Sequence, residues 1–474
     1  VAVIAVPVLP RTSSDAAHQR GLRVMVDLVI SHTSAKHKWF VESRSSRTNA
    51  KADWYVWAEP KPDGTPPTNW LSIFGGSAWE WDSRRRQYYL HNFLTSQPDL
   101  NFHNPTVQDV MLSIARFWLE RGVDGFRLDT VNMYFHDAEL RDNPPMAEGM
   151  AVNGIPEQNP YSMQEPRYNI TRPENHAFLE RLRGLMDEFP ATACVGEVGA
   201  VTDMYKTLAD YTVEGERLHM AYSFDFLSHT YSAGHVRSVV ERMEANPGSW
   251  PSWAFSNHDV ERVISRWDQG EHSEKAGPLL VALLASLRGT PCLFQGEELG
   301  LPEAVVPYEL LQDPYGIRFW PDYRGRDGCR TPMPWNDHTV EAGFTAGESW
   351  LPIPEEHAKR AVSIQENDPA SPLNRVRRFL NWRKDHPIFK DGSIRFLDAG
   401  EDVVAFMRET GDDTIICVFN LAPDDVSVDI PTLASAHPIQ GHGFDGTKVE
   451  STLTLKGFDA FFGTITSQTG QSNG

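Results

Sequence analysis

The stretch GFRLDT, residues 125–130, has the composition of a short buried strand that ends in charged residues. Charges in such a place are costly unless they are paired or used in chemistry. We therefore expect Arg127 to hold the carboxylate of Asp129 ionised and oriented, as a nucleophile requires. The alternative interpretation is an ion pair that only stabilises the fold, and for a single such pair it is the commoner one.

Outward from this strand, buried strands alternate with amphipathic helices. The preceding residues predict a helix in which Asn104 is the cap, Pro105 lies in the first turn and Gly122 follows the end. Apolar residues recur there every three or four positions. Other strand candidates are RVMVDLVI (23–30), TACVGEV (192–198), MAYSFDF (220–226), SWAFSN (252–257) and PCLFQGEELG (291–300). This alternation predicts a parallel sheet covered on both faces.

Polar residues gather directly after these strands. They are Asp27 to His32, Asp129, Glu197, Asp225, His258 with Asp259, and Glu297 with Glu298. The carboxyl ends of the strands in a TIM barrel open onto one face, where the chemistry takes place. A doubly wound sheet would also bind ligands at strand ends, but it more often carries a glycine-rich phosphate loop, which we do not find. The predicted fold class is α/β, a TIM (β/α)8-type barrel.

Two segments depart from this rhythm and define the expected domains. Residues 33–102 are rich in Trp, Tyr, Pro and Gly and show little helical periodicity, so we expect an irregular domain inserted after the third strand. From about residue 392, short alternating strands predict an antiparallel β-sandwich. The expected domains are a catalytic barrel of residues 1–32 and 103–391, an inserted domain of residues 33–102, and a C-terminal domain of residues 392–474.

Composition and charge argue against several classes of protein. The net charge is −20, from 44 basic and 64 acidic residues, which argues against nucleic acid and anionic membrane surfaces as partners. No apolar run approaches the ~20 residues of a membrane span, and VAVIAVPVL (1–9) lacks the basic region of a signal peptide. Cys194, Cys292, Cys329 and Cys417 show no metal-ligand spacing, so we expect free thiols, no bound metal and a cytoplasmic protein.

Three acids follow three different predicted strands: Asp129, Glu197 and Asp259. Glycoside hydrolysis needs two carboxyl groups that flank one bond, a proton donor and, in retaining enzymes, a nucleophile. Glu197 follows the apolar residues ACVG, a setting that favours the protonated form an acid needs. A third carboxylate can stabilise positive charge on the sugar. Three acids at one end of a barrel favour catalysis over three separate structural ion pairs.

Seven motifs together resemble glycoside hydrolase family 13, the α-amylase family, and within it the α-glucosidase and oligo-1,6-glucosidase branch. They are DLVISHTS (27–34), QPDLN (97–101), GFRLDTVN (125–132), VGEVG (195–199), FSNHD (255–259), GEELG (296–300) and GRDGCRTPMPW (325–335). The similarity runs from about Ala16 to the end of the chain. The motif QPDLN is similar to the oligo-1,6-glucosidase branch rather than to the amylases.

The resemblance implies a role for each matching residue. Asp129 would be the nucleophile, Glu197 the acid/base, and Asp259 the residue that stabilises the transition state. The residues implied to hold a glucose in the first subsite are His32, Arg127, His258 and Arg326, and those implied to wall the pocket are Phe74 and Phe93. Such a pocket implies exo action with retention on a small oligosaccharide.

Thr130 bears on the linkage that is cleaved. In this branch, Val after the nucleophile goes with α-1,6 bonds, and Thr or Ala goes with α-1,4 bonds. The resemblance thus implies an α-glucosidase acting on maltose-like or sucrose-like substrates, with glucosyl transfer as a common side activity. The alternatives are a sucrose isomerase or trehalose synthase, and a non-catalytic relative that binds sugar or serves as a scaffold. No cofactor is implied, and we expect a monomer or a weak homodimer.

The beginning of the chain departs from the family pattern. AAHQRGLRV (16–24) resembles the end of the helix before the third strand, so we expect the barrel to lack its first two strands. VAVIAVPVL is a candidate for one of them. The family's divalent-ion site (Ca or Mg) and the aspartate that pairs with Arg326 would lie in the missing part. A catalytically impaired member of the family is therefore a further alternative.

Overall fold

The computed structural model describes residues 3–5, 11–152, 155, 159–199, 201–246, 248–411 and 413–466. The chain divides into two compact units. The first unit contains the described residues up to Asp225 together with Met243–Pro251. The second contains Phe226–Arg242 and the described residues from Ser252 onward.

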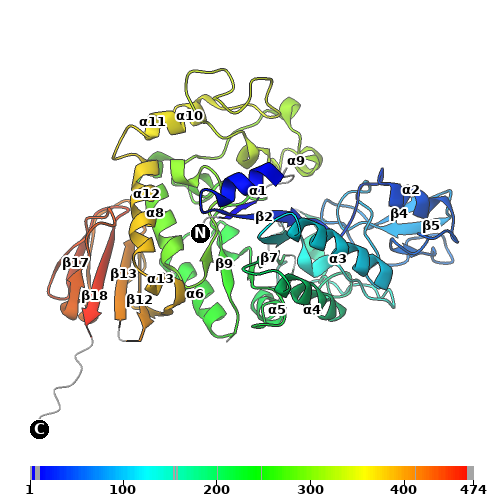
Figure 1. The fold of residues 1–474 in the computed structure, drawn as a ribbon, viewed down its shortest axis with the longest axis horizontal. Coiled ribbons are helices and arrows are strands. Elements are labelled where there is room, and N and C mark those ends of the chain that lie inside the picture. Colours follow the sequence, from blue (N-terminus) through cyan, green and yellow to red (C-terminus); the bar gives the residue numbers. More distant parts are fainter. Residues whose placement is uncertain are drawn as a thin grey trace, which may run out of the picture. The chain divides into compact units, whose positions relative to one another are not determined.

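The first unit is built on a parallel sheet (Figure 1). Its strands pair in the order β1 (Val3–Ala5), β2 (Arg23–Leu28), β6 (Gly125–Leu128), β7 (Ala193–Glu197) and β8 (Met220–Tyr222). The helices between these strands are α1 (Arg11–His18), α3 (Pro105–Leu119), α4 (Glu174–Asp187) and α5 (Met204–Tyr211). All four residues of β6 are buried, as expected for a strand in a sheet that is covered on both faces.

Helix α3 begins where the sequence predicts. The side chain of Asn104 accepts the backbone N–H of Thr106, and Pro105 occupies the first turn. After the helix, Gly122 adopts a φ of +84°, which glycine tolerates best. At Gly125 a Cβ atom would lie 1.8 Å from the carbonyl oxygen of Ala193, so the approach of β6 to β7 requires glycine there.

The opening segment supplies a parallel strand. Val3 pairs with Arg23 and Ala5 with Met25, so β1 lies beside β2. The described residues therefore contain seven parallel strands, one more than the six that sequence patterns assigned.

The segment inserted after β2 is more regular than expected. It contains α2 (Lys38–Ser45) and an antiparallel sheet in the order β3 (Trp57–Ala58), β5 (Gln87–Leu90) and β4 (Trp79–Asp82). The prediction of little helical structure is wrong for residues 38–45. His37 caps this helix through its ring nitrogen Nδ1, and histidine is not among the usual capping residues.

Two further strands, β9 (Pro251–Trp253) and β10 (Thr290–Pro291), are parallel to each other. In the second unit, Ser252 pairs with Thr290. The helices of this part are α6 (Ala233–Glu244), α7 (Val263–Arg266), α8 (Ser273–Ser286), α9 (Pro314–Phe319), α10 (Glu355–Ala358), α11 (Val362–Gln365), α12 (Pro372–Lys384) and α13 (Ile388–Asp391).

The strand predicted over residues 252–257 is wrong in length, because β9 ends at Trp253. The side chains of Ser256 and Asn257 accept the backbone N–H groups of Val263 and Asp259. Side chains that bond the backbone locally in this way compete with the hydrogen bonds of a sheet. Asp259 therefore lies on a loop and not at the end of a strand.

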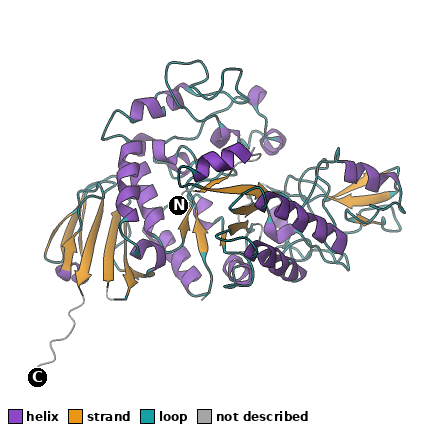
Figure 2. Cartoon of the chain, viewed as in Figure 1, coloured by secondary structure: helices purple, strands orange, loops and turns teal. Residues whose placement is uncertain are grey.

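The C-terminal part is antiparallel (Figure 2). One sheet has the order β11 (Ser393–Leu397), β12 (Val403–Thr410), β13 (Asp413–Asn420), β18 (Ala460–Thr466) and β15 (Ala436–Pro438), and the other has the order β14 (Val426–Asp429), β17 (Thr452–Leu455) and β16 (Thr447–Val449). One hydrophobic core joins the two sheets, with Met407 and Ile416 from the first and Leu453 and Leu455 from the second. The predicted β-sandwich is confirmed.

A buried arginine ties this sandwich to a helix of the same unit. Arg408 of β12 has no exposed surface. Its guanidinium donates hydrogen bonds to the carbonyl oxygens of Ser286 and Leu287 at the end of α8, and to those of Gly392 and Ser393 before and in β11. A cation at a helix C-terminus is favourable, because the last carbonyl groups carry partial negative charge.

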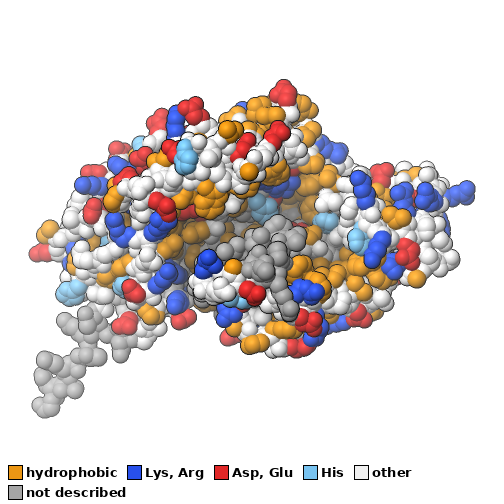
Figure 3. All heavy atoms as spheres, turned by 45° about the horizontal axis from the view of Figure 1, so that its top comes forward, with side chains coloured by type: hydrophobic (Ala, Val, Ile, Leu, Met, Phe, Trp, Pro, Cys, Tyr) orange, Lys and Arg blue, Asp and Glu red, His pale blue; other side chains and the backbone are white. Residues whose placement is uncertain are grey.

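Acidic and basic side chains are interspersed over most of the face shown in Figure 3. Within the described part of the chain, no helix is both long and apolar enough to cross a membrane. The expectation that the protein binds neither nucleic acid nor membranes stays a prediction.

Candidate active site

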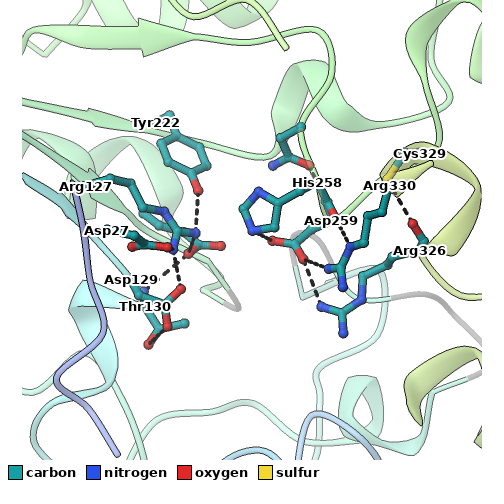
Figure 4. A network of polar contacts seen from close by, with 12 residues as sticks. Asp27, Arg127, Asp129, Thr130, Tyr222, His258, Asp259, Arg326, Cys329 and Arg330 are labelled. Carbon is teal, nitrogen blue, oxygen red and sulfur yellow. Dashed lines mark hydrogen bonds and ion pairs between the residues drawn. The ribbon is translucent and has the colours of Figure 1, made fainter. Parts of the chain in front are cut away.

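The acid cluster of the first unit is organised around Arg127 (Figure 4). Its Nη1 atom contacts Asp129 and both carboxylate oxygens of Asp27, the latter at 2.9 and 3.0 Å. Its Nη2 atom contacts Glu197 and lies 3.1 Å from the hydroxyl oxygen of Tyr222. Burial alone would lower the pKa of the guanidinium, but Tyr222 and the three carboxylates outweigh it and raise that pKa above its usual range. Arg127 is therefore charged.

The structure confirms one expectation about this cluster and corrects another. Asp129 pairs with Arg127, as the sequence predicts. The apolar environment expected for the carboxyl group of Glu197 is wrong, because that group also pairs with Arg127. Strands β6 and β7 are neighbours in the sheet, with Arg127 opposite Val195, so the guanidinium reaches the end of β7. One arginine thus brings Asp129 and Glu197 together.

Thr130, directly after Asp129, has a strained backbone. Its φ of +41° lies in the left-handed region, where a β-branched residue is an outlier. Such a conformation costs on the order of 1–3 kcal/mol and persists only where the surroundings hold it. The hydroxyl oxygen of Thr130 lies 3.4 Å from Asp129 Oδ2 and 3.4 Å from the hydroxyl oxygen of Ser31. These contacts place the side chain of Thr130 inside the acid cluster.

His32, Phe74 and Phe93 form an aromatic group in the same unit. The ring centroid of Phe93 lies 5.5 Å from that of His32 and 5.6 Å from that of Phe74. Both ring nitrogens of His32 have partners, Ser31 Oγ at 2.9 Å and Gln97 Nε2 at 3.0 Å. Burial lowers the pKa of His32, and the charge of Asp129 opposes this only in part. Phe93 therefore contacts both His32 and Phe74, which were predicted separately.

The acid cluster of the second unit is organised around Asp259 (Figure 4). Its Oδ1 atom accepts hydrogen bonds from Arg326 Nη1 at 2.8 Å and from Arg330 Nη2 at 2.9 Å. His258 Nε2 lies 3.2 Å from Oδ2. Arg330 also donates through Nε to the carbonyl oxygen of His258 at 2.7 Å. The structure therefore brings together His258, Asp259 and Arg326, the three site residues predicted for this unit.

Arg326 was expected to lose its carboxylate partner, and this expectation is wrong. Besides Asp259, it pairs with Asp313, whose carboxylate accepts hydrogen bonds from Nη2 at 2.8 Å and from Nε at 3.0 Å. Asp313 precedes α9 and caps that helix by accepting the backbone N–H of Tyr315.

The loop that carries Asp259 is fixed by Arg262. Its backbone N–H donates to Glu303 Oε2 at 2.9 Å. Its guanidinium donates to the carbonyl oxygens of Gln295 at 2.7 Å and Cys329 at 2.9 Å. Burial raises the pKa of Glu303 to about 7, although its hydrogen bond from Arg262 opposes the rise. Arg262 thus joins the Asp259 loop to the two segments that follow β10 and α9.

The described residues offer no group of three or more His, Cys, Asp or Glu side chains arranged to hold a metal ion. All four cysteines are reduced thiols, as predicted, with Cys194, Cys329 and Cys417 buried and Cys292 exposed.

Four contact residues of these clusters received no role from the sequence: Asp27, Tyr222, Asp313 and Arg330. The rule that polar residues gather at strand ends named Asp27, which lies in β2, but gave it no role. The same rule could have found Tyr222, which ends β8. Arg330 belongs to a motif that was recognised. Asp313 lies between two helical turns with no periodic pattern around it, and no signal in the sequence indicated it.

Comparisons with known proteins agree with this geometry. The family described as Alpha amylase, catalytic domain, matches residues 11–392, and the family described as Maltogenic Amylase, C-terminal domain, matches residues 394–461. A probable α-glucosidase of Rhizobium meliloti is 54% identical over 94% of this chain and 81% of its own length. An oligo-1,6-glucosidase of Parageobacillus thermoglucosidasius is 32% identical over 87% of this chain and 77% of its own length.

Solved structures give the same result. The α-glucosyl transfer enzyme XgtA is 50% identical and superimposes with a TM-score of 0.93 over 96% of this chain and 85% of its own. The isomaltulose synthase of Erwinia rhapontici, 28% identical, superimposes with a TM-score of 0.83 over 96% of this chain and 85% of its own. The family match and the relatives named α-glucosidase and oligo-1,6-glucosidase show that the protein is a glycoside hydrolase, and its parallel strands, helices and C-terminal sandwich agree with this class. The chain belongs to the α-amylase family, glycoside hydrolase family 13.

Proposed function

We propose that the protein is a retaining, exo-acting α-glucosidase that releases glucose from the non-reducing end of maltose-like or sucrose-like substrates. The observation that carries the proposal is the pairing of Asp129 and Glu197 with one guanidinium. Retaining glycosidases use two neighbouring carboxyl groups, ~5–5.5 Å apart. Relatives named α-glucosidase and oligo-1,6-glucosidase support the same reaction class.

In the proposed reaction, Asp129 attacks the anomeric carbon while Glu197 gives its proton to the leaving glycosidic oxygen. The leaving sugar departs as an alcohol, and a covalent glucosyl ester of Asp129 remains. Glu197, now a carboxylate, takes a proton from water as the water oxygen attacks the anomeric carbon. Glucose leaves with its α configuration, and both acids return to their starting state. The two carboxyl groups and water supply the atoms that the reaction needs.

The two neighbouring carboxyl groups are proposed to take different roles. Asp27, Asp129 and Glu197 share one arginine. We assign the role of nucleophile to Asp129 and that of acid/base to Glu197, because these are the roles that the resemblance to the α-amylase family implies for the two positions.

Asp259 is proposed to stabilise the positive charge that develops on the sugar ring and to bind sugar hydroxyl groups. Arg326 and Arg330 hold its Oδ1 atom, which orients the carboxylate. His258 and Arg326 are proposed to bind the same glucose. In the first unit, His32 is proposed to bind it as well, and Phe74 and Phe93 to wall the pocket.

Hydrolysis of maltose tests the proposal directly. The purified 474-residue chain should release glucose from maltose, and proton NMR in the first minutes should show the α anomer of the sugar from the non-reducing end. Initial appearance of the β anomer would contradict retention. Absence of glucose release from maltose, isomaltose and sucrose would favour the non-catalytic alternative.

Replacing Thr130 by valine should shift the ratio of kcat/KM for maltose to that for isomaltose toward isomaltose by about 10-fold. Valine keeps the β-branched shape but removes the hydroxyl that lies beside Asp129 and Ser31. Competition of both disaccharides, resolved by chromatography, measures the ratio. Thr212→Val is the matched control, since Thr212 is also buried and donates to the carbonyl oxygen of Leu208. A ratio that stays the same in Thr130→Val would remove Thr130 as the linkage determinant.

Glucosyl transfer is proposed as a second outcome of the same intermediate, because a sugar or small alcohol can replace water as the attacking group. The likeness to a glucosyl transfer enzyme and to an isomaltulose synthase supports this proposal. We further propose a cytoplasmic monomer or weak homodimer. The free thiols of Cys194, Cys329 and Cys417 support a reducing compartment.

A further inference from the structure

Two carboxylates of the second unit accept hydrogen bonds from different nitrogen atoms of the Arg326 guanidinium. Its Nη1 atom meets Asp259 at 2.8 Å, whereas its Nη2 and Nε atoms meet the two oxygens of Asp313 at 2.8 and 3.0 Å. The backbone N–H of Arg326 also donates to Asp313 at 2.9 Å. A guanidinium gripped by two parallel hydrogen bonds has a fixed plane and direction. Asp313 therefore determines where Nη1 points.

Asp313 is itself rigidly placed. Its side chain has no exposed surface. Its backbone N–H, and that of Gln312, donate to Asp327 Oδ2 at 2.8 and 2.6 Å. Its Oδ1 atom accepts the N–H of Tyr315, so the same carboxylate caps α9 and binds Arg326. A side chain with this many fixed partners has little freedom to move.

Two glycines let the arginine segment approach this helix. A Cβ atom on Gly316 would lie 2.6 Å from the carbonyl oxygen of Arg324, and one on Gly325 would lie 2.6 Å from the Cα atom of Gly316. Gly325 also has a φ of +80°, which favours glycine. The close approach brings the Arg326 side chain beside the ring of Tyr315, 5.8 Å from its centroid.

Two carboxylates and two guanidinium groups pair with one another in this cluster. Arg326 pairs with Asp259 and Asp313, and Arg330 pairs with Asp259. Burial alone would raise the pKa of Asp313, but the hydrogen bonds and charge of Arg326 outweigh it and hold that pKa below its usual range. Asp313 is therefore ionised at neutral pH, and its neutralisation would remove the negative charge that holds Nε and Nη2 of Arg326.

We propose that Asp313 is a positioning residue for the glucosidase reaction, which acts through Arg326 by fixing the guanidinium so that Nη1 faces Asp259 and the glucose. The proposal rests on the proposed function and assigns Asp313 no contact with substrate.

Asp313→Asn tests the proposal, because asparagine keeps an oxygen for the cap of α9 but loses the charge and the two-oxygen grip. We expect kcat/KM for maltose to fall about 10- to 100-fold, and the affinity for glucose, measured by calorimetry, to weaken. Asp459→Asn is the matched control, since Asp459 is also a buried aspartate and its carboxylate accepts hydrogen bonds from the backbone N–H groups of Asp445 and Ala460. That control should change kcat/KM by less than about threefold.

A double-mutant cycle separates positioning from general loss of structure. In an Arg326→Gln background, Asp313→Asn should cost less than about twofold in kcat/KM, because its effect is transmitted through the absent guanidinium. A full additional loss in that background would overturn the proposal.

A crystal structure of Asp313→Asn distinguishes failure of this proposal from failure of the proposed function. We expect the Arg326 guanidinium to leave Asp259 or to occupy several orientations. Retention of its position on Asp259 would overturn the proposal whether or not the unaltered chain hydrolyses maltose.

Discussion

Replacing Asp129 by asparagine should reduce glucose release from maltose by at least about 1,000-fold, because the amide cannot form the glucosyl ester. The fold should survive, since asparagine has the same shape and Arg127 keeps Asp27 and Glu197 as partners. Steady-state kinetics measure the loss, and circular dichroism compares the thermal transitions of the two proteins. Turnover close to that of the unaltered chain would contradict the assignment of the nucleophile.

Asp27→Asn is the matched control for this prediction. This substitution removes the negative charge of a carboxylate that pairs with the same guanidinium, but it leaves the proposed nucleophile in place. We expect it to retain measurable turnover. In a complementary experiment, Glu197→Gln should accumulate a glucosyl ester when it is given α-glucosyl fluoride, whose leaving group needs no proton. Peptide mass spectrometry should find the added glucosyl group on Asp129, and its presence on another residue would assign the nucleophile there.

Replacing Arg408 by methionine should lower the free energy of unfolding by about 3–5 kcal/mol. Methionine fills much of the space but leaves the buried carbonyl oxygens of Ser286, Leu287 and Gly392, and the partly buried one of Ser393, without this donor. The substitution therefore weakens the contact between the end of α8 and the sandwich. Chemical denaturation followed by circular dichroism measures it.

Arg395→Met is the matched control for Arg408. Arg395 lies on the neighbouring strand β11, its side chain is 56% exposed, and it pairs with Glu409 on the surface. Because exposed ion pairs contribute little, we expect a loss of less than about 1 kcal/mol. Equal losses in the two variants would show that burial of the Arg408 guanidinium does not determine its contribution.

The parts of the fold that could be predicted from the sequence are those with a periodic pattern of apolar residues. Strand β6, helix α3 and the alternating strands of the sandwich follow from residue spacing and from capping at Asn104. The ends of β8 and β9 did not follow, because Ser223, Ser256 and Asn257 turn the backbone by local hydrogen bonds that an apolar pattern does not reveal.

The candidate site was predictable in its residues more than in its contacts. Arg127 lies in β6 and Asp129 follows directly after this strand, so their pairing could be inferred from their spacing. The contact of Glu197 with Arg127 depends on which strands are neighbours and in what register. The contact of Asp313 with Arg326 depends on the close approach at Gly316 and Gly325. Information of this kind arises only when distant segments fold together.

The left-handed backbone at Thr130 has a consequence for anyone who randomises this position to change substrate preference. Glycine and asparagine adopt such a backbone more readily than β-branched residues do. Clones that carry them can therefore be enriched because they express and fold better, whatever sugar they accept. Selection for a new linkage at position 130 should accordingly be ranked by turnover per folded molecule and not by yield of product.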